Sequence, residues 1–411
     1  MADNIPPDKA SRASAGGKIQ SGSVADFRYK PSPPPDQKPP EPPVTGAPGT
    51  GARTRAAAKV QGGPPPLPPR QANGRTGRHR GRQAYAALDL GTNNCRLLIA
   101  RPSGENFTVI DAFSRVVKLG EGLAVSGQLS DKAMDRALGA LTICADKLRR
   151  RNVFLARSVA TEACRRASNG QDFIDRVRKE TGIVLDIISA QEEARLAVLG
   201  CHVLLEQGHG PAVIFDIGGG STELVLIEPG ENVPRILDWQ SVPWGVVSLS
   251  DTVPRRGDDD ASRLGRYAQM RQLVSDSFAP FAERVAPWRR KADPRLLGTS
   301  GTVTTLASLH LELPQYDRQA VDGLIVPSDS MREICQRLAG MTWAERSDLP
   351  CIGHDRAELV VAGCAILEAI LDLWPTAELG VADRGIREGI LRSLMAADLT
   401  PPQTADQGSA K

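Results

Sequence analysis

The stretch AVIFDIGGGSTE, from Ala212 to Glu223, decides the fold of this chain. Its first six residues are apolar except for Asp216, which predicts a buried strand, and the glycines after them predict a tight turn before a second strand. Residues 84–100 repeat this layout, with Asp89 near the end of the first strand and the turn Gly91-Thr92-Asn93-Asn94 after it. The sequence therefore predicts the same hairpin twice, each with an aspartate ahead of its turn.

Strands and helices alternate around the two hairpins, which favours a mixed α/β fold. The hairpins lie too far apart for a short-period solenoid repeat, so we expect two related α/β domains, over residues 84–196 and 197–397. Helices are expected over residues 130–151, 172–181, 191–205, 260–285, 356–373 and 385–395, and from residue 303. Further strands are expected over residues 153–160, 183–188, 295–297 and 379–382.

Residues 1–83 differ from the rest of the chain in net charge and in proline content. The 411 residues have a net charge of +3, but residues 1–83 alone carry 14 Lys/Arg, 5 Asp/Glu and 16 of the 31 prolines. The other residues carry 37 Lys/Arg and 43 Asp/Glu. A Pro-rich segment with so few apolar residues cannot offset its ordering entropy, so we expect a disordered tail over residues 1–83 and a second one over residues 398–411. The basic cluster at residues 75–82 is interpreted as a solvated linker in preference to a polyanion site.

Several classes of protein are excluded by what the sequence lacks. It has no run of 18 apolar residues and no apolar leader at its start, so we expect neither a membrane span nor secretion. Its seven cysteines are dispersed without a C-x-x-C pair, which favours reduced thiols in the cytoplasm over disulfides or a zinc site. Aromatic residues make up 4% of the chain, too few for stacking platforms, so no specific nucleic-acid partner is expected.

Three loops rich in Gly, Ser and Thr follow predicted strands, at residues 91–94, 218–222 and 298–302. Glycine lets the backbone approach a ligand and present N–H groups to it, and such arrays bind phosphate. None of the loops has the Walker A or the dinucleotide-binding spacing. The predicted phosphate-binding residues of the three loops are Gly91, Thr92, Asn93, Gly218, Gly219, Gly220, Ser221, Thr222, Gly298, Thr299, Ser300 and Gly301.

Asp89 and Asp216 end apolar strands just before phosphate loops. A carboxylate repels phosphate unless a cation lies between them, and Mg²⁺ commonly bridges phosphate oxygens to one or two carboxylates. A structural turn cap is the alternative for each aspartate. We favour a Mg²⁺ site, most strongly for Asp216 beside its three glycines.

Glu192 and Glu193 begin the helix expected after the strand at residues 183–188. Acidic residues in a first helical turn usually complement the helix dipole, but beside phosphate loops one of them could activate water. Neighbouring helical residues differ by about 100° in direction, so at most one can face a cleft. Arg96 and Arg165 are candidate phosphate ligands, with ordinary surface ion pairs as the alternative.

The order of the motifs resembles the Ppx/GppA family, the exopolyphosphatases and guanosine pentaphosphate phosphohydrolases. The motifs in this chain are DLGTNN at residues 89–94, ATEACR at residues 160–165, EEAR at residues 192–195, DIGGGSTE at residues 216–223, GTSGT at residues 298–302 and ADRGIREG at residues 382–389. The resemblance covers about residues 84–395.

This resemblance implies an actin-like, ribonuclease H-like fold of two duplicated α/β lobes with a cleft between them. It implies Mg²⁺-assisted hydrolysis of a terminal phosphoanhydride, with Glu193 as the catalytic base. The metal-linked carboxylates then fall on Asp89, Asp216 and Glu223, and the phosphate contacts fall on the first two loops. Arg96 takes the place of a basic residue in the first motif. A homodimer is a further option that the resemblance raises.

The substrate stays open between inorganic polyphosphate and guanosine pentaphosphate (pppGpp). Longer members of the family continue with helical domains that grip a long chain, whereas 16 residues follow Met395 here. We therefore expect activity on short chains or on a nucleotide more than processive degradation. Alternatives from other classes are a kinase or ATPase of the same architecture and a non-catalytic polyphosphate or nucleotide sensor. The exopolyphosphatase hypothesis leads because Glu193 and both Asp-hairpins are present.

Overall fold

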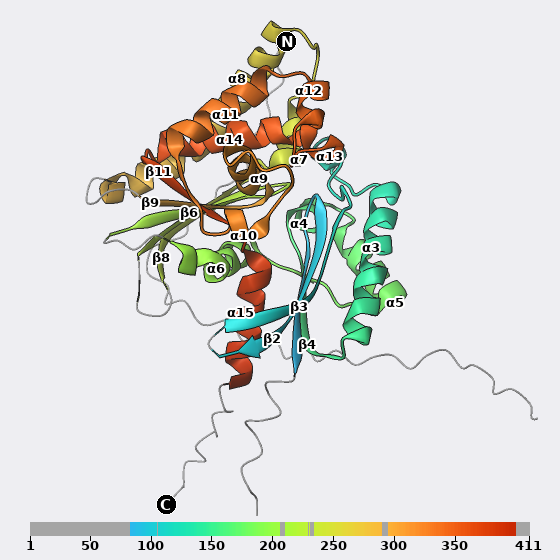
Figure 1. The fold of residues 1–411 in the computed structure, drawn as a ribbon. Helices are drawn as coiled ribbons and strands as arrows, with labels where there is room; N and C mark the ends of the chain where they lie inside the picture. Colours follow the sequence, from blue (N-terminus) through green and yellow to red (C-terminus); the bar gives the residue numbers. More distant parts are fainter. Residues whose placement is uncertain are drawn as a thin grey trace, which may run out of the picture.

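The structure is a computed structural model that describes residues 83–104, 106–205, 210–228, 230, 234–289 and 295–399. Except for residues 83, 398 and 399, the two predicted tails lie outside the described residues. The described chain forms two lobes, each built on one mixed sheet (Figure 1). None of the described helices combines the length and the apolar character that crossing a lipid bilayer requires.

The first lobe is built on a five-stranded sheet in the order β3-β2-β1-β4-β5. β1 pairs with β2 in an antiparallel hairpin and with β4 in parallel. The side chains of β1 alternate between two cores. Leu88 and Leu90 pack towards helices α3 (Asp131–Arg150) and α5 (Gly170–Thr181), and Tyr85 and Ala87 pack towards helix α15 (Ile386–Leu399). Burial on both faces explains why this strand reads as a continuous apolar run. The strands are β1 (Ala84–Leu90), β2 (Asn94–Ser103), β3 (Asn106–Val116), β4 (Val153–Ala160) and β5 (Asp186–Ile187).

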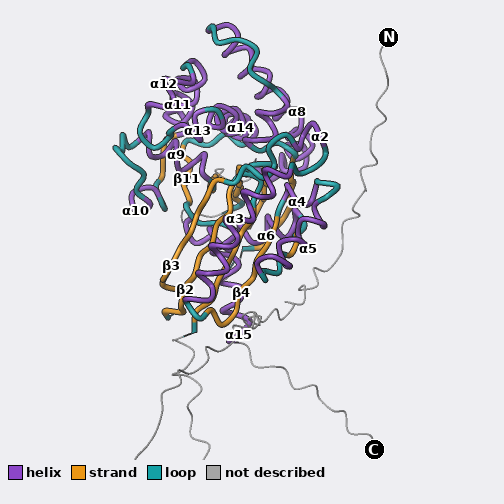
Figure 2. The backbone as a smooth tube through the Cα atoms, turned by 90° about the vertical axis from the view of Figure 1, so that its right-hand side faces the viewer, coloured by secondary structure: helices purple, strands orange, loops and turns teal. Residues whose placement is uncertain are grey.

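The helices of the first lobe follow local sequence signals. The hydroxyl of Ser130 accepts a hydrogen bond from Ala133 N and so caps α3, and Gly182 ends α5 in a left-handed conformation at φ 75°. Figure 2 shows α3 and α5 on the same side of the sheet. The helices before the second hairpin are α2 (Leu123–Ser126), α3 (Asp131–Arg150), α4 (Glu162–Arg166), α5 (Gly170–Thr181), α6 (Ala190–Cys201) and the 3-10 turn η1 (His202–Leu204).

The second lobe is built on a six-stranded sheet in the order β10-β11-β9-β6-β7-β8. Its central strand β6 again alternates: Val213 and Phe215 pack into the large core of the lobe, and Ala212 and Ile214 pack with α6. The strands are β6 (Ala212–Ile217), β7 (Thr222–Glu228), β8 (Arg235–Val242), β9 (Arg295–Thr299), β10 (Ile325–Pro327) and β11 (Glu378–Ala382). The helices are α7 (Val246–Thr252), α8 (Asp260–Arg289), α9 (Gly301–His310), α10 (Arg318–Val321), α11 (Ser328–Gly340), α12 (Trp343–Asp348), α13 (His354–Ala357) and α14 (Leu359–Leu373).

Helix α15 (Ile386–Leu399) follows the second sheet in the chain but packs on the first. It also crosses α6 closely: a Cβ added to Gly389 would lie 2.0 Å from Leu196 O, and one added to Gly200 would lie 2.0 Å from Gly385 O. Helix α6 contributes side chains to a core of each lobe. The predicted division at residue 196 therefore falls inside a helix that both lobes share, and α15 runs two residues into the predicted C-terminal tail.

Each lobe thus opens with an antiparallel hairpin whose first strand also pairs in parallel with a later strand, which is the duplicated actin-like arrangement that the sequence predicts. The second strands are longer than predicted, and two edge strands, β3 and β8, complete their sheets. The strand predicted over residues 183–188 is reduced to the two residues of β5.

Candidate active site

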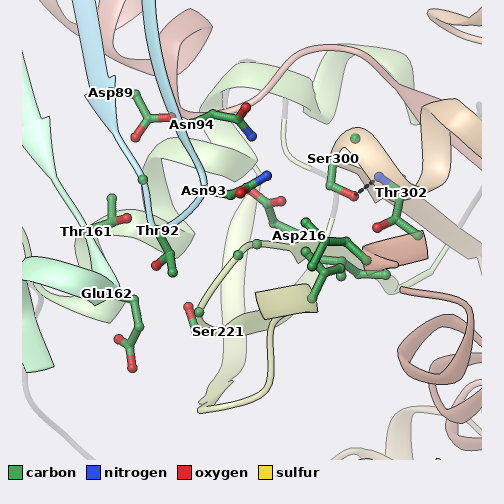
Figure 3. A pocket seen from close by; sticks show the side chains of 18 of the residues that line it. Asp89, Thr92, Asn93, Asn94, Thr161, Glu162, Asp216, Ser221, Ser300 and Thr302 are labelled. Atoms are coloured by element: carbon green, nitrogen blue, oxygen red, sulfur yellow. Dashed lines mark hydrogen bonds between the residues drawn. The ribbon is translucent and has the colours of Figure 1, made fainter. Parts of the chain in front are cut away.

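The turns of the two hairpins lie against each other between the lobes. A Cβ added to Gly219 would lie 2.9 Å from Thr92 Cβ and 3.0 Å from Asn93 N. One added to Gly220 would lie 2.6 Å from Thr92 Oγ1 and 2.8 Å from Glu162 Cγ. Figure 3 shows Thr92 and Asn93 from the first hairpin facing Ser221 and Asp216 from the second hairpin. Only glycine allows this approach, so contact between the lobes requires glycine at positions 219 and 220.

Backbone hydrogen bonds to their carbonyl oxygens hold both turns in place in the same way. Thr92 O accepts a hydrogen bond from Gly120 N at 2.9 Å, and Gly218 O accepts one from Val246 N at 3.0 Å. The carbonyl oxygens of Asn93 and Gly219 also accept hydrogen bonds from backbone N–H groups. In the described part of the chain, the N–H groups of Thr92, Asn93, Gly219 and Gly220 have no acceptor. These donors are available to an anion, as the sequence predicts for phosphate loops.

A cavity of about 970 Å³, including its open mouth, lies between the turns. It brings together residues from both hairpins, from α6 and from the loop before α9. The predicted site residues that line it are Asp89, Gly91, Thr92, Asn93, Arg96, Glu193, Asp216, Gly218, Gly219, Gly220, Ser221, Ser300 and Gly301.

Five predicted site residues do not line this cavity: Arg165, Thr222, Glu223, Gly298 and Thr299. The Thr222 hydroxyl donates to Trp244 O at 2.6 Å, and the Thr299 hydroxyl donates to Arg384 O at 2.6 Å. A Cβ on Gly298 would lie 2.4 Å from the ring of Phe215. These three residues hold the loops in place from inside the second lobe.

The third loop bends sharply into α9. Ser300 has a φ of 128°, in a region that side-chain-bearing residues seldom adopt, and its hydroxyl accepts a hydrogen bond from Thr302 N (Figure 3). This bend brings Gly301 and the first turn of α9 to the cavity. A Cβ on Gly301 would lie 3.8 Å from Arg96 Nη2, so the Arg96 guanidinium reaches from the first lobe to this loop.

Three buried oxygen atoms of the first hairpin have no hydrogen-bond partner in the described part of the chain. They are Asp89 Oδ1, Thr92 Oγ1 and Asn93 Oδ1. All three residues line the cavity, and Asp89 and Asn93 present acceptor oxygens. A buried acceptor without a donor costs about 1–3 kcal/mol, so a ligand that offers a donor or a positive charge fits this place.

Four carboxyl groups gather behind the turns, on β1, α6, β6 and β7. Burial, together with the nearby Glu223 and Asp89, raises the pKa of Asp216 to about 8. Burial likewise raises the pKa of Asp89, and it raises the pKa of Glu223 to about 7 against the hydrogen bonds from Ser221 and Ser241. The pKa of Glu193 is raised well above its ordinary range by burial and by Glu223, and Arg165 opposes this shift.

The chemistry of this group fits Mg²⁺. Mutual repulsion of buried carboxylates is relieved by a bound cation, and the unpartnered oxygens of Asp89 and Asn93 are hard ligands of the kind that Mg²⁺ prefers. Among the described residues, no three His, Cys, Asp or Glu side chains form a complete cage for a metal. Mg²⁺ typically takes one or two carboxylates and completes its shell with water and substrate phosphate, so an incomplete protein cage suits it.

Glu192 and Glu193 point in different directions, as helical geometry predicts. Glu193 lines the cavity and is 7% exposed. Glu192 forms ion pairs with Arg157 at 2.9 Å and Arg195 at 2.7 Å. The pKa of Glu192 is lowered because these two arginines outweigh its burial. Of the pair, only Glu193 is placed to meet a ligand in the cavity.

The remaining cavity residues were not singled out as ligands from the sequence. Thr161 and Glu162 stand in the quoted ATEACR motif, which was a usable signal, and Asn94 and Thr302 stand in the loops themselves. Arg356 had no signal beyond a predicted helix start; its Nη1 donates to Thr305 Oγ1 at 3.0 Å beside the third loop. Five apolar residues also line the cavity: Ile217, Val246, Leu359, Val360 and Ile386.

Known proteins are similar to this chain in sequence. The profile of the Ppx/GppA phosphatase family matches residues 98–398. The chain is 33% identical to exopolyphosphatase 2 of Mycobacterium tuberculosis over 323 residues, which cover 75% of this chain and 98% of that protein.

Solved structures agree with these sequence matches. The crystal structure of an exopolyphosphatase from Cytophaga hutchinsonii matches with a TM-score of 0.67 at 26% identity, covering 77% of this chain and 98% of that one. The Aquifex aeolicus member of the Ppx/GppA family matches with a TM-score of 0.63 at 26% identity, covering 78% of this chain and 99% of that one. With its two Asp-hairpins, its buried glutamate and these matches, the chain belongs to the Ppx/GppA phosphatase family.

Proposed function

We propose that the chain is an exopolyphosphatase that removes the terminal phosphate of inorganic polyphosphate as orthophosphate. The observation that carries this proposal is the position of Glu193, buried in the cavity wall between two turns with unpaired N–H groups. The name of the Mycobacterium tuberculosis relative supports the same substrate.

The two turns would hold the terminal phosphate through their N–H groups, with the hydroxyls of Thr92 and Ser221 beside them. Arg96 and the first turn of α9 at Gly301 would hold the next phosphates along the chain. Asp89 and Asp216 would hold Mg²⁺, with Glu223 behind them. When bound, this ion supplies positive charge against the phosphate oxygens.

Glu193 would act as the general base. A water molecule beside its carboxylate attacks the terminal phosphorus while Glu193 accepts a proton from that water. A new bond forms between the phosphorus and the water oxygen, and the bridging P–O bond breaks. The products are orthophosphate and a polyphosphate one unit shorter, whose terminal oxygen takes up the released charge.

Glu193→Gln tests this assignment, and Glu192→Gln is its matched control. The two residues are neighbours on one helix, but only Glu193 reaches the cavity. We expect Glu193→Gln to lower kcat for polyphosphate by about 10²- to 10⁴-fold, the usual contribution of general-base catalysis, with binding retained. Glu192→Gln should keep kcat within about twofold of the parent, since it loses only partly exposed ion pairs. Full turnover in Glu193→Gln would remove this residue from the mechanism.

A specific observation also favours pppGpp as a substrate. The apolar side chains of Val246, Leu359 and Val360 form part of the cavity wall. Polyphosphate offers nothing apolar to such a wall, whereas a nucleoside does. Side-by-side phosphate release from polyphosphates of several lengths and from pppGpp, with and without Mg²⁺, decides between them. A higher kcat/KM for pppGpp would replace polyphosphate as the principal substrate.

A further inference from the structure

Arg165 lies behind Glu193, with Glu162 on its other side. Its Nη1 donates to Glu193 Oε2 at 3.0 Å and to the carbonyl oxygen of Ile188 at 2.7 Å. Its Nε donates to Glu162 Oε2 at 3.1 Å, and its Nη2 contacts the same oxygen. The planar guanidinium therefore connects two carboxylates and the backbone just before α6.

This arrangement leaves Arg165 poorly placed to bind phosphate. Its side chain is 21% exposed, it does not line the cavity, and its donors are directed to groups of the protein. The two carboxylates that it contacts, Glu193 and Glu162, both line the cavity, and the Glu193 side chain is 9% exposed. The side chain of Arg96, by contrast, lines the cavity and makes no hydrogen bond or ion pair with another described residue. The charge of Arg165 thus acts on Glu193, and the charge of Arg96 is available to substrate.

We infer that Arg165 is a positioning residue that fixes the carboxylate of Glu193 for attack on the water, and that Glu162 fixes Arg165 in turn. This inference rests on the proposed role of Glu193 as general base. A freely rotating glutamate would sample several χ angles, whereas the Nη1 donor fixes one of its oxygens and leaves the other for water.

The position of Glu162 connects this arrangement to the second lobe. Glu162 lines the cavity, and its Cγ lies 2.8 Å from where a Cβ of Gly220 would be. The turn of the second hairpin therefore packs directly on the residue that holds Arg165. The three side chains lie on α4 and α6, in segments far apart in sequence, and the contact with the turn of the other lobe helps to keep them together.

The test measures kcat and KM separately for Arg165→Gln, with Arg166→Gln as the matched control. Arg166 is the next residue of α4; its side chain is 42% exposed, and its partner Glu162 is 3.7 Å away. A misplacement of about 1 Å in a catalytic group can lower turnover by roughly 100-fold, so we expect Arg165→Gln to lower kcat by about 10- to 100-fold. Its KM for polyphosphate should stay within about twofold, and Arg166→Gln should match the parent in both constants.

Two further measurements separate positioning from a fold defect. In Arg165→Ala, guanidinium chloride at millimolar concentration should restore part of kcat, whereas urea, which has a similar shape and no charge, should not. In the Glu193→Gln background, Arg165→Gln should lower the residual kcat no further, because the group that it positions is already gone. Should the arginine variants not fold, Glu162→Gln carries the same expectation, with kcat lowered, KM unchanged and no further loss in the Glu193→Gln background.

The outcomes distinguish this inference from the proposed function. A tenfold rise in KM at unchanged kcat in Arg165→Gln makes Arg165 a phosphate ligand and overturns the inference, while Glu193 keeps its role. Additive losses in the double variant overturn it as well. Full activity in Glu193→Gln instead refutes the proposed base, whatever Arg165 does. A kcat effect with guanidinium rescue and no additivity establishes the positioning role.

Discussion

The carboxyl group of Asp216 lies near those of Glu223 and Asp89, and burial raises its pKa to about 8. In the unfolded chain the same group ionises near its ordinary value of 3.8. Between these two values the folded chain keeps a proton that the unfolded chain has released, so the free energy of unfolding falls as the pH rises through this window. Asp216 thus makes the protein less stable at neutral and alkaline pH, which is common for residues kept for function.

We therefore expect Asp216→Asn to raise the unfolding midpoint at pH 8 in the absence of divalent cations, and to abolish phosphate release. The gain at pH 8 should be on the order of a few kcal/mol and should shrink towards pH 4. Urea unfolding at several pH values measures it, with the exposed Asp348→Asn as the control. If the free energy of unfolding depended on pH equally in the parent and in Asp216→Asn, the raised pKa of Asp216 would not be the source of the pH dependence.

At single residues, the sequence predicted the loops better than the directions of their side chains. Helical periodicity predicted only that Glu192 and Glu193 could not both face a cleft, and the family resemblance was needed to choose Glu193. Thr222 and Thr299 lie in the predicted loops, yet their hydroxyls bond carbonyls inside the lobe, since adjacent residues of an extended segment face opposite ways. Arg356 could not be found, because only folding brings α13 beside a loop more than fifty residues earlier.

Secondary structure was predictable where burial is uniform and less so where it is mixed. β1 and β6 are buried on both faces and read as apolar runs. β3 and β8 are edge strands with irregular, half-exposed patterns, so neither periodicity nor composition distinguished them from loops. The turn of η1 ends α6 earlier than expected, and α14 begins after the separate turn of α13.

The position of helix α15 in the sequence does not indicate which lobe it packs on. Its residues Ile390, Leu391 and Leu394 are buried against Tyr85 and the first sheet, about three hundred residues earlier in the chain. The sequence assigned this helix to the second lobe because its signals were local. Its packing instead closes the first lobe with the last helix of the chain.

Leu391→Ala should therefore destabilise the first lobe. Leu391 is fully buried in the core that includes Tyr85 and Leu98, and removing such a side chain typically costs about 2–5 kcal/mol. Denaturant unfolding measures the loss, and hydrogen exchange locates it on β1 and β2. Ala397→Ser, at an exposed position of the same helix, is the control and should change little. Loss of protection confined to the second lobe would show that α15 does not stabilise the first.

Across the whole molecule, polar contacts among the described residues join the lobes in addition to the packing of the two hairpin turns. Gly122 N donates to Asp251 Oδ2 at 3.0 Å, and Lys118 lies 3.8 Å from Asp355. The overall charge does not favour a polyanion, since the residues after 83 carry more acidic than basic side chains. Attraction of substrate must then come from groups inside the cavity, which are the N–H arrays, Arg96, Arg356 and the proposed Mg²⁺.

This view predicts weak dependence on monovalent salt. Charges farther apart than the Debye length, about 10 Å at 0.1 M, are screened, while groups in direct contact with phosphate are screened less. At fixed Mg²⁺, kcat/KM for polyphosphate should change less than about threefold between low and high KCl, with or without residues 1–82. Steady-state kinetics of the full chain and of the shortened chain measure this. A tenfold fall with KCl that disappears on removing residues 1–82 would show instead that the basic segment gathers substrate by long-range attraction, and the solvated-linker interpretation would be wrong.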